Sequence, residues 1–283
     1  MNATLASAAD ILSTPWGMTI FILLDIVILL FIIALNYRWL FKRLFDILFS
    51  LAFLAVFLPF FLLFLAADAI YNKVQNAYKT LFVGEYYCGK KGKLIYLVTF
   101  ATERIVHDAE GNLLPEAQRV TKMGKILRGC GIKYYPLLAA VFTGKLSFVG
   151  PRPLSPADYA AMKEEDLIRF QVRPGLVSSL ESYGGDSLTY DDLFEEDAEY
   201  VRKRSLFRDV GFFISKIVHR LRGETVRRFG ECTEKSYVPW LLEQGRIDEE
   251  EAKEFLQTQR FRIDNLKKQE RARNQPANRS MLR

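Results

Sequence analysis

An apolar run with a proline at its centre, from Lys42 to Ile70, constrains the fold of this chain more than any other segment. A helix needs about 20 apolar residues to cross a bilayer, and this run is long enough. Pro59 has no amide hydrogen and clashes with the preceding turn, so we predict a break near this residue. Basic residues favour the cytoplasmic side, and they flank both ends of the run: Arg38, Lys42, Arg43, Lys73 and Lys79. The sequence therefore predicts a re-entrant membrane hairpin, with a straight span that tolerates its proline as the alternative.

A second apolar segment, Trp16 to Tyr37, has the length of one complete transmembrane helix. No lysine or arginine precedes Arg38, which predicts an N-terminus outside the membrane and Arg38 inside. The segment lacks the basic n-region and the small-residue cleavage site of a signal peptide, so we expect no cleavage. Asp25 lies near the middle of the span, where charge is costly, and marks either a polar contact with a partner or an acid without a role.

Positive charge is concentrated near the C-terminal end of the sequence. The 283 residues carry a formal net charge of +6, and residues 260–283, with eight basic residues and two acids, equal that charge. Beside a membrane, such a tail is attracted to anionic lipid headgroups. Solvated disorder without a partner explains the tail equally well. Nucleic acid is not expected as a partner, because Phe261 is the one aromatic residue among these charges.

Cysteine and histidine usage argues against two classes of enzyme site. Cys88, Cys130 and Cys232 form no CxxC pair, which suits free thiols in the reducing cytosol. His107 and His219 are the only histidines, so little is present from which to build a zinc site or a His-based nucleophilic triad.

The region after the hairpin is predicted to be α+β and mainly helical, with a small β component. Residues 86–100 are rich in aromatic and β-branched residues around a Gly-Lys turn, which indicates two strands. Helices are expected at 121–127, 134–142, 158–170 and 190–204. We divide the chain into an N-terminal segment with the transmembrane helix (1–37), the re-entrant hairpin (38–71), a cytoplasmic domain (72–224) and a helical extension with a basic tail (225–283).

Residues 205–221 place apolar side chains at helical spacing: Leu206, Val210, Phe213, Ile217 and Leu221. A basic amphipathic helix next to a membrane anchor can lie in the headgroup plane. Packing on the domain core explains the same pattern, and amphipathicity alone does not choose between the two.

Four elements stand in a fixed order: Lys42-Arg43-x-x-Asp46 with the mid-membrane Pro59, a GKIL element ending in Arg128, LSFVGPRPLSP from residue 146, and Arg173-Pro174-Gly175 followed by LVS. Together they resemble the bacterial sugar transferases, the monotopic phosphoglycosyl transferases that load a sugar phosphate onto polyprenyl phosphate. The likeness extends from about residue 42 to residue 221. Residues 147–153 match the family signature SLVGPRP almost letter for letter, and Arg128 stands at the arginine of its RxxSLDELPQL motif.

The resemblance implies chemistry at phosphorus. In the family an adjacent Asp-Glu pair supplies the nucleophile and acid-base support, with Mg²⁺ bound alongside. Arginine suits diphosphate because its planar guanidinium group binds two oxygens at once. Arg128, Arg152 and Arg173 are therefore the candidate phosphate-binding residues, with structural pairing as the alternative role.

The chain departs from the family at the catalytic positions. Aligning residues 128–138 with RxxSLDELPQL places Lys133 on the aspartate and Tyr134 on the glutamate. The family's QxR and KFRTM elements lose three cations, which are replaced by Tyr87, Thr99 and Ala101. A lysine at a metal-binding carboxylate position repels Mg²⁺ and cannot form an acyl phosphate. No catalytic residue and no metal ligand are therefore assigned.

The leading hypothesis is a non-catalytic family member of exopolysaccharide or glycoconjugate assembly, without a cofactor, that acts as partner, regulator or scaffold for glycan-assembly proteins or a catalytic paralogue. The alternative is an active sugar-1-phosphate transferase that uses Mg²⁺ and displaced acids, of which Asp186, Asp191 and Asp192 are the nearest; a helix cap and a solvated face explain these acids more simply. A sensor that binds lipid or nucleotide-sugar without turnover is the third. We expect the bacterial inner membrane, a cytoplasmic domain, an outside N-terminus, and the bilayer and polyprenyl phosphate as contacts.

Overall fold

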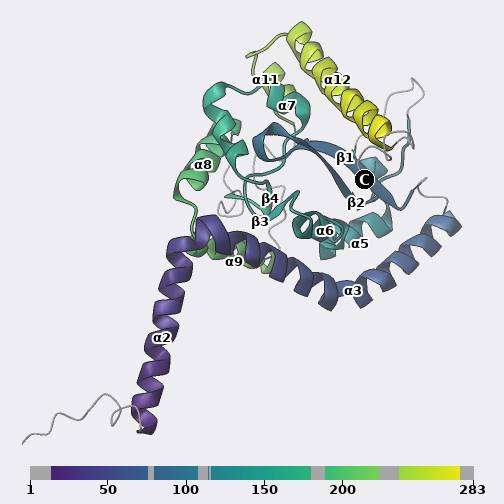
Figure 1. Ribbon diagram of the computed structural model, residues 1–283. Coiled ribbons are helices and arrows are strands. Elements are labelled where there is room, and N and C mark those ends of the chain that lie inside the picture. The colour runs from purple at the N-terminus through teal and green to yellow at the C-terminus, as the bar shows by residue number, and fades with distance from the viewer. Residues whose placement is uncertain are drawn as a thin grey trace, which may run out of the picture.

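The structure is a computed structural model, and it describes residues 14–75, 80–107, 114, 116–179, 189–222 and 236–274. Among these residues helices predominate, and the strands form two small two-stranded sheets (Figure 1). The predicted class, α+β and mainly helical, is confirmed.

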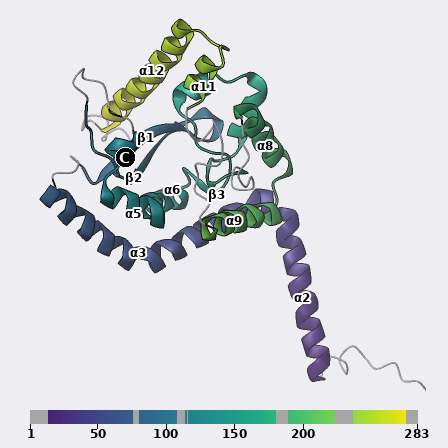
Figure 2. The same cartoon turned by 180° about the vertical axis from the view of Figure 1, so that it is seen from behind.

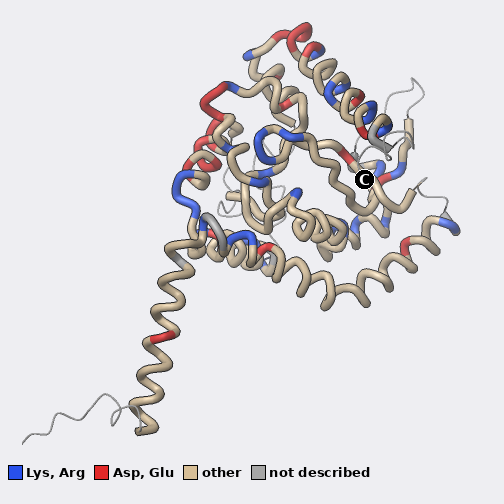
Figure 3. The backbone as a smooth tube through the Cα atoms, viewed as in Figure 1, with Lys and Arg blue, Asp and Glu red and all other residues tan. Residues whose placement is uncertain are grey.

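Two long apolar helices precede the domain. α2 (Pro15–Asn36) begins after Thr14, whose hydroxyl oxygen accepts a hydrogen bond from the amide of Gly17 at 3.0 Å. A turn of π-helix, η1 (Tyr37–Phe41), links it to α3 (Lys42–Gln75) and redirects the chain, so that α2 points away from the domain (Figure 1). Both helices are long and apolar enough to cross a membrane, and their most apolar stretches are almost entirely exposed. Figure 3 shows few charged residues along them, which supports a membrane location.

Pro59 bends α3 but does not end it. The helix is continuous from Lys42 to Gln75, so the predicted interruption of the helix is wrong. The predicted bend agrees with its shape, a bow whose concave side faces the domain (Figures 1 and 2). Tyr135 fastens the middle of this bow: its hydroxyl donates to the carbonyl oxygen of Leu54 at 2.6 Å, and its ring stacks on Phe61 with centroids 4.3 Å apart. A proline distorts the helix just before it, and the Tyr135 hydroxyl gives the carbonyl oxygen of Leu54, in this region, a hydrogen-bond donor from outside the helix.

The predicted antiparallel hairpin is confirmed, and it begins earlier than the sequence indicated. β1 (Phe82–Cys88) pairs with β2 (Leu94–Phe100) across the 3₁₀ turn η2 (Lys90–Gly92), with Tyr86 opposite Tyr96 and Tyr87 opposite Ile95. Strand side chains alternate between faces. The face that carries Tyr87, Ile95 and Leu97 packs against α6 (Leu137–Phe142) and forms one of the cores.

Short helices lead from the hairpin toward α6: α4 (Glu116–Arg119), α5 (Lys122–Cys130) and the 3₁₀ turn η3 (Ile132–Tyr134). Thr121 caps α5 by accepting the amide of Gly124 at 2.8 Å, and Gly131 ends it at φ 75°. The helix predicted at 121–127 is thus confirmed. The one predicted at 134–142 is divided into η3 and α6, because Pro136 lacks the amide that a continuous helix requires.

Two strands of three residues each were not predicted. β3 (Ser147–Val149) and β4 (Gly175–Val177) pair in parallel, and α7 (Pro156–Ala160) and the 3₁₀ helix η4 (Glu164–Gln171) connect them in place of the single helix expected at 158–170. Runs of three residues are too short to show the alternation by which strands are recognised.

α8 (Tyr190–Lys203) agrees with the predicted acidic helix, and α9 (Leu206–Leu221) lies beside the first half of α3 (Figures 1 and 2). Phe212 of α9 is buried against Val149 and Val177. A separate stripe of apolar side chains is exposed: Phe207, Val210, Ile214, Ile217 and Leu221. One face of α9 therefore packs on the core, as one interpretation expected, while another presents an apolar surface.

The C-terminal extension packs on the domain, on the side away from α3 (Figures 1 and 2). α11 (Tyr237–Glu243) joins the core of Tyr190 and Phe194 through Trp240 and Leu241. α12 (Glu249–Asn274) places Arg262 over the Tyr159 ring at 4.9 Å, where it donates to the carbonyl oxygen of Gly92 at 2.8 Å. The disorder interpretation of the basic tail is therefore wrong for residues 260–274. Residues 275–283, Cys232 and Asp186 lie outside the described residues.

Candidate functional site

The Lys-Arg-x-x-Asp element joins the membrane helix α3 to the domain. Lys42 donates to the carbonyl oxygen of Val149 at 3.0 Å and pairs with Asp209. Asp46, one turn later, accepts the hydroxyl of Ser147 at 2.8 Å and the amide of Phe148 at 3.0 Å. The spacing of four residues puts both side chains on one face of α3. The element therefore holds β3, which leads directly into the GPRP turn.

Asp209 is the centre of a buried polar cluster that involves four elements. Its carboxylate accepts the hydroxyl of Tyr200 at 2.7 Å, the hydroxyl of Tyr37 and the ammonium group of Lys42. The Tyr200 hydroxyl also lies 3.2 Å from the carbonyl oxygen of Val149. Burial, and next the charge of Asp209, raise the pKa of Tyr200 well above its usual value, so this hydroxyl stays protonated and donates.

Arg43 points toward the C-terminal end of α6. Its two terminal nitrogens donate to the carbonyl oxygens of Val141 and Phe142, each at 2.7 Å. The last carbonyl groups of a helix have no partners within the helix, and a cation there also complements the helix dipole. Lys42, Arg43 and Asp46 thus all make contacts between α3 and the domain.

The GPRP and RPG turns are built around two glycines in close contact. The amide of Gly150 donates to Val177 and the amide of Gly175 donates to Pro151, each at 2.9 Å. A Cβ on Gly175 would lie 2.2 Å from the backbone nitrogen of Gly150, so no larger residue fits. These turns hold the backbones of Arg152 and Arg173 in fixed positions.

Arg152 lies beside tyrosine and a buried ion pair. Its carbonyl oxygen accepts Arg169 at 2.8 Å, and Arg169 is fully buried with Asp197, 2.8 Å away. Burial and a hydrogen bond to Glu85 raise the pKa of Tyr87, whereas the nearby charge of Arg152 opposes that rise. Tyr87 occupies the position of a family cation, so the surroundings of Arg152 offer a neutral hydroxyl where the resemblance implies positive charge.

Arg128 is already paired within the chain. Its Nε donates to the hydroxyl of Thr102 at 2.9 Å, and its terminal nitrogen pairs with the carboxylate of Glu103. Glu103 also pairs with Arg119 at 2.7 Å. The resemblance implies that the Arg128 guanidinium group binds phosphate, but here it binds the carboxylate of Glu103. This favours a structural role for Arg128.

Lys133 and Tyr134, which the resemblance places at the two catalytic positions, lie in the turn η3. The ammonium group of Lys133 is 5.6 Å from the centre of the Tyr134 ring, and Tyr134 is 52% exposed. This cation–π contact lies at the surface and provides no carboxylate to act as nucleophile or metal ligand.

Arg173 and Arg128 bind different partners in the chain. Its Nε donates to the carbonyl oxygen of Gly144 at 2.8 Å, and its side chain lines a cavity of about 350 Å³ together with Lys90, Lys93 and Lys145. Partial burial and the charge of Arg173 hold the pKa of Lys90 below its usual value. Among the residues that the structure describes, four basic residues and one acid, Glu270, therefore line this cavity.

Two of the acids considered as displaced catalysts have structural contacts. Asp192 and Thr189 form a capping box at the start of α8. Asp191 accepts both terminal nitrogens of Arg246, at 2.9 and 2.7 Å, and this hydrogen bonding lowers the pKa of Asp191. These contacts agree with the interpretation of both acids as cap and surface residues.

Comparison with known proteins identifies the family. A model described as bacterial sugar transferase matches residues 37–223. This chain belongs to the bacterial sugar transferase family. It is 33% identical to the uncharacterized sugar transferase EpsL of Bacillus subtilis over 150 residues, which cover 53% of this chain and 74% of the relative.

Other relatives carry more specific names. A UDP-glucose:undecaprenyl-phosphate glucose-1-phosphate transferase of Caulobacter vibrioides is 37% identical over 100 residues, 32% of this chain and 38% of the relative. The exopolysaccharide production protein ExoY of Rhizobium meliloti is 30% identical over 92 residues, 32% of this chain and 41% of the relative. The chain thus spans less than half the length of these two proteins.

Four residues of this family member make contacts around the site but were not recognised from the sequence: Glu103, Arg119, Tyr200 and Asp209. Glu103 gave a signal in the sequence. It lies in the segment that aligns with the family's KFRTM element, and it is negatively charged where that element is basic. Asp209 also gave a signal, because it lies three residues before the core residue Phe212, on the side of α9 that packs inward.

The implied Mg²⁺ does not fit the residues present. The part of the chain that the structure describes contains no group of three or more His, Cys, Asp or Glu side chains able to hold a metal ion. Lys133 adds a positive charge where the resemblance implies a metal ligand, and Glu103 is shared between two arginines.

Proposed function

We propose that this chain is a membrane-anchored, non-catalytic member of the bacterial sugar transferase family that acts as a partner or scaffold in polysaccharide assembly. One observation carries the proposal: Arg128 is bound by Glu103, and Lys133 with Tyr134 replaces the carboxylate pair. In the family, the nucleophile that attacks phosphorus comes from a carboxylate pair. Lys133 and Tyr134 carry no carboxylate, so this nucleophile is missing. The retained GPRP, RPG and Lys-Arg-x-x-Asp elements all make contacts that hold the fold together.

The alternative, an active transferase with displaced acids, has less support among the described residues. Asp191 is held by both nitrogens of Arg246, and Asp192 caps α8. An acid that reacts with phosphorus would have to leave these contacts. Polyprenyl phosphate therefore enters the proposal as a ligand and not as a substrate of this chain, and no cofactor is required.

The test is nucleoside monophosphate release by the purified full chain from nucleotide-activated sugars, with polyprenyl phosphate and Mg²⁺ and the Caulobacter relative as positive control. We expect no release. Lys133→Asp with Tyr134→Glu should not start the reaction, because the cations at Tyr87, Thr99 and Ala101 remain absent and each transition-state contact contributes about 3 kcal/mol.

Turnover by the unmodified chain that survives Arg152→Ala would overturn the proposal. Turnover that is lost in Asp191→Asn or Asp192→Asn would instead establish a displaced-acid transferase. Because Asp191 also holds Arg246, the melting temperature of each variant must be measured alongside its activity.

For the membrane, we propose that α2 crosses and that α3 enters and leaves on the side of the domain, in the bacterial inner membrane with the domain cytoplasmic. Contacts along α3 support this: Asp46 binds Ser147 near its start, Leu54 accepts Tyr135 near its middle, and Tyr71 packs with Ala101 near its end. A helix that touches one domain at both ends and in the middle cannot leave it to reach the other membrane face. The exposed apolar stripe of α9, beside α3, supports a position in the headgroup plane.

Cysteine labelling tests this arrangement. In a chain without its native cysteines, we expect Ser7→Cys to react with a membrane-impermeant maleimide only from outside, and Lys79→Cys only from inside. Labelling of both positions from the same face would show that α3 spans the membrane. Asp248→Cys, on the extension of the domain, is the matched control and should label from the same side as Lys79→Cys.

A further inference from the structure

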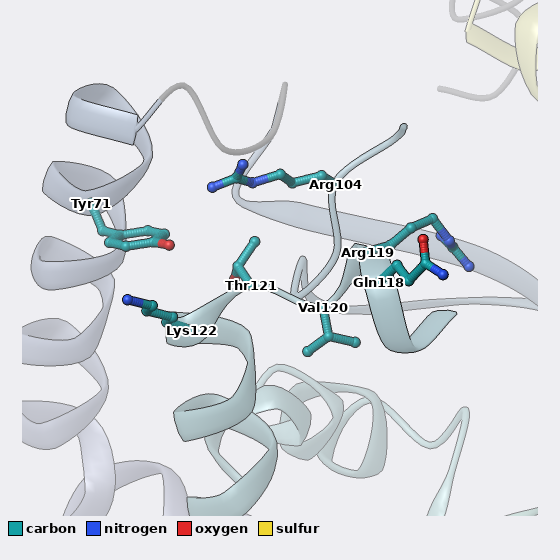
Figure 4. Close-up of a pocket in the computed structure, with 7 residues that line it drawn as sticks. All are labelled: Tyr71, Arg104, Gln118, Arg119, Val120, Thr121 and Lys122. Atoms are coloured by element: carbon teal, nitrogen blue, oxygen red, sulfur yellow. The ribbon is translucent and has the colours of Figure 1, made fainter. Parts of the chain in front are cut away.

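A cavity of about 410 Å³ lies where the last turns of α3 meet the domain (Figure 4). Tyr71 of α3 forms one wall, and the opposite side consists of Arg104, Arg119, Thr121 and Lys122. The segment from β2 to α5 brings these residues together, because the amide of Thr121 donates to Thr102 at 3.0 Å and that of Arg104 to Arg119 at 2.9 Å.

The charges around the cavity are positive. In Figure 4 the side chains of Arg104 and Lys122 extend toward the helix that carries Tyr71, whereas Arg119 points away. Arg119 is paired with Glu103 at 2.7 Å and donates to Leu114 at 2.8 Å. None of the described residues that line the cavity is an acid, and no described acid forms an ion pair with Arg104 or Lys122. Two cations and the Tyr71 hydroxyl thus converge on a space without a described counter-ion.

The position of the cavity indicates which anion it meets. α3 is apolar and exposed along most of its length up to this point, including Ile70 and Val74 on either side of Tyr71. On the domain side Ile105, next to Arg104, is 67% exposed. Tyrosine is enriched at the level of lipid headgroups, and basic side chains near anionic headgroups favour binding. The apolar surface of α3 can contact the acyl chains of a lipid, and the two cations and the tyrosine at its end can bind the phosphate of the same molecule.

We propose that this cavity binds the phosphate group of an anionic phospholipid, with Arg104 and Lys122 as its cations and the Tyr71 hydroxyl as a further polar partner. The lipid would tie the end of α3 to the N-terminus of α5. The site is separate from Lys133 and Tyr134, which lie beyond the other end of α5. The proposal rests on the membrane placement of α3 and not on the absence of catalysis. Cysteine labelling measures that placement, whereas the binding test measures lipid affinity in detergent, so the failure of one can be told from the failure of the other.

The test uses the full chain in a neutral detergent, titrated with short-chain phosphatidylglycerol, with short-chain phosphatidylcholine, and with inorganic phosphate. Thermal unfolding reports binding, because a ligand that prefers the folded state raises the melting temperature. We expect stabilisation by phosphatidylglycerol alone. Removing one charge, in Arg104→Gln or Lys122→Gln, should weaken the apparent affinity about fivefold, and Arg104→Lys should retain most of it.

Lys253→Gln is the matched control, because this exposed lysine lies on α12, away from α3, and its substitution removes one charge from the same chain. It should bind phosphatidylglycerol as the unmodified chain does. Equal affinity in the double variant Arg104→Gln/Lys122→Gln, or an equal loss in Lys253→Gln, would overturn the proposal. Equal stabilisation by inorganic phosphate would also overturn it, since the ligand would then be a free anion and not a lipid.

Discussion

Asp209→Ala is expected to lower the free energy of unfolding by about 3–5 kcal/mol, because it leaves the ammonium group of Lys42 buried without its carboxylate. The hydroxyls of Tyr37 and Tyr200 lose their acceptor in the same change. These groups come from η1, α3, α8 and α9, so the loss affects the junction between membrane helices and domain. Chemical denaturation in detergent, followed by tryptophan fluorescence, measures the change.

A matched control and a rescue make this test specific. Asp264→Ala removes an exposed carboxylate on α12 and should change stability by less than about 0.5 kcal/mol. Adding Lys42→Met to Asp209→Ala removes the buried charge itself and should recover part of the loss, because apolar replacement of both partners is often tolerated. Equal effects of Asp209→Ala and Asp264→Ala would contradict the assignment of Asp209 as the centre of the cluster.

Arg169→Met is expected to destabilise the domain by about 3–5 kcal/mol at pH 8, because Asp197 would remain fully buried without its cation. The guanidinium group also lies over the Phe194 ring at 5.0 Å and holds the carbonyl oxygen of Arg152. Its loss therefore affects the core of α8 and the GPRP turn together. Denaturation midpoints across pH measure the change.

The pH dependence of this variant has a definite sign. Burial raises the pKa of Asp197 to about 6 even beside Arg169, whose charge lowers it, so removing Arg169 raises the value further. An acid with a raised pKa in the folded state destabilises the protein as pH rises through that value, because the unfolded chain releases its proton more readily. We expect the loss in Arg169→Met to be smaller at pH 5 than at pH 8.

Replacement of both partners is the control for this experiment. Arg169→Met with Asp197→Leu should recover most of the stability at pH 8. The double variant should also lose the pH dependence that comes from the Asp197 carboxyl, because that group is no longer present. A loss in Arg169→Met that is the same at pH 5 and pH 8, or a double variant as unstable as the single one, would show that the pair does not act as argued.

Local features of the sequence were sufficient for several elements. The apolar run of α2, the aromatic and β-branched residues of β1 and β2, and Thr121 with Gly131 around α5 each carry a signal within a few residues. For the candidate site, the sequence offered only an alignment with the family motif. That alignment places Lys133 and Tyr134 at the catalytic pair, and it remains a prediction.

Contacts between distant residues required the tertiary structure. Arg128 meets Glu103 across 25 positions, Lys42 meets Asp209 across 167, and Arg262 reaches Gly92 across 170. Such pairs leave no periodic pattern, because they depend on how helices pack and not on spacing within one helix. The continuity of α3 also required the tertiary structure. Proline chemistry alone predicted an interruption, whereas α3 continues past Pro59 and contacts Tyr135 through Leu54 and Phe61.

The sequence by itself determined the two apolar helices and the family motifs, and it placed Lys133 and Tyr134 where the resemblance expects carboxylates, because each of these is a property of residue type and local order. The tertiary structure alone decided that Arg128 is paired with Glu103, that the basic extension packs on the hairpin, and that Arg104 and Lys122 converge beside Tyr71. A charged side chain is satisfied by whatever partner folding brings within a few ångströms, and that partner is set by the packing of the whole chain.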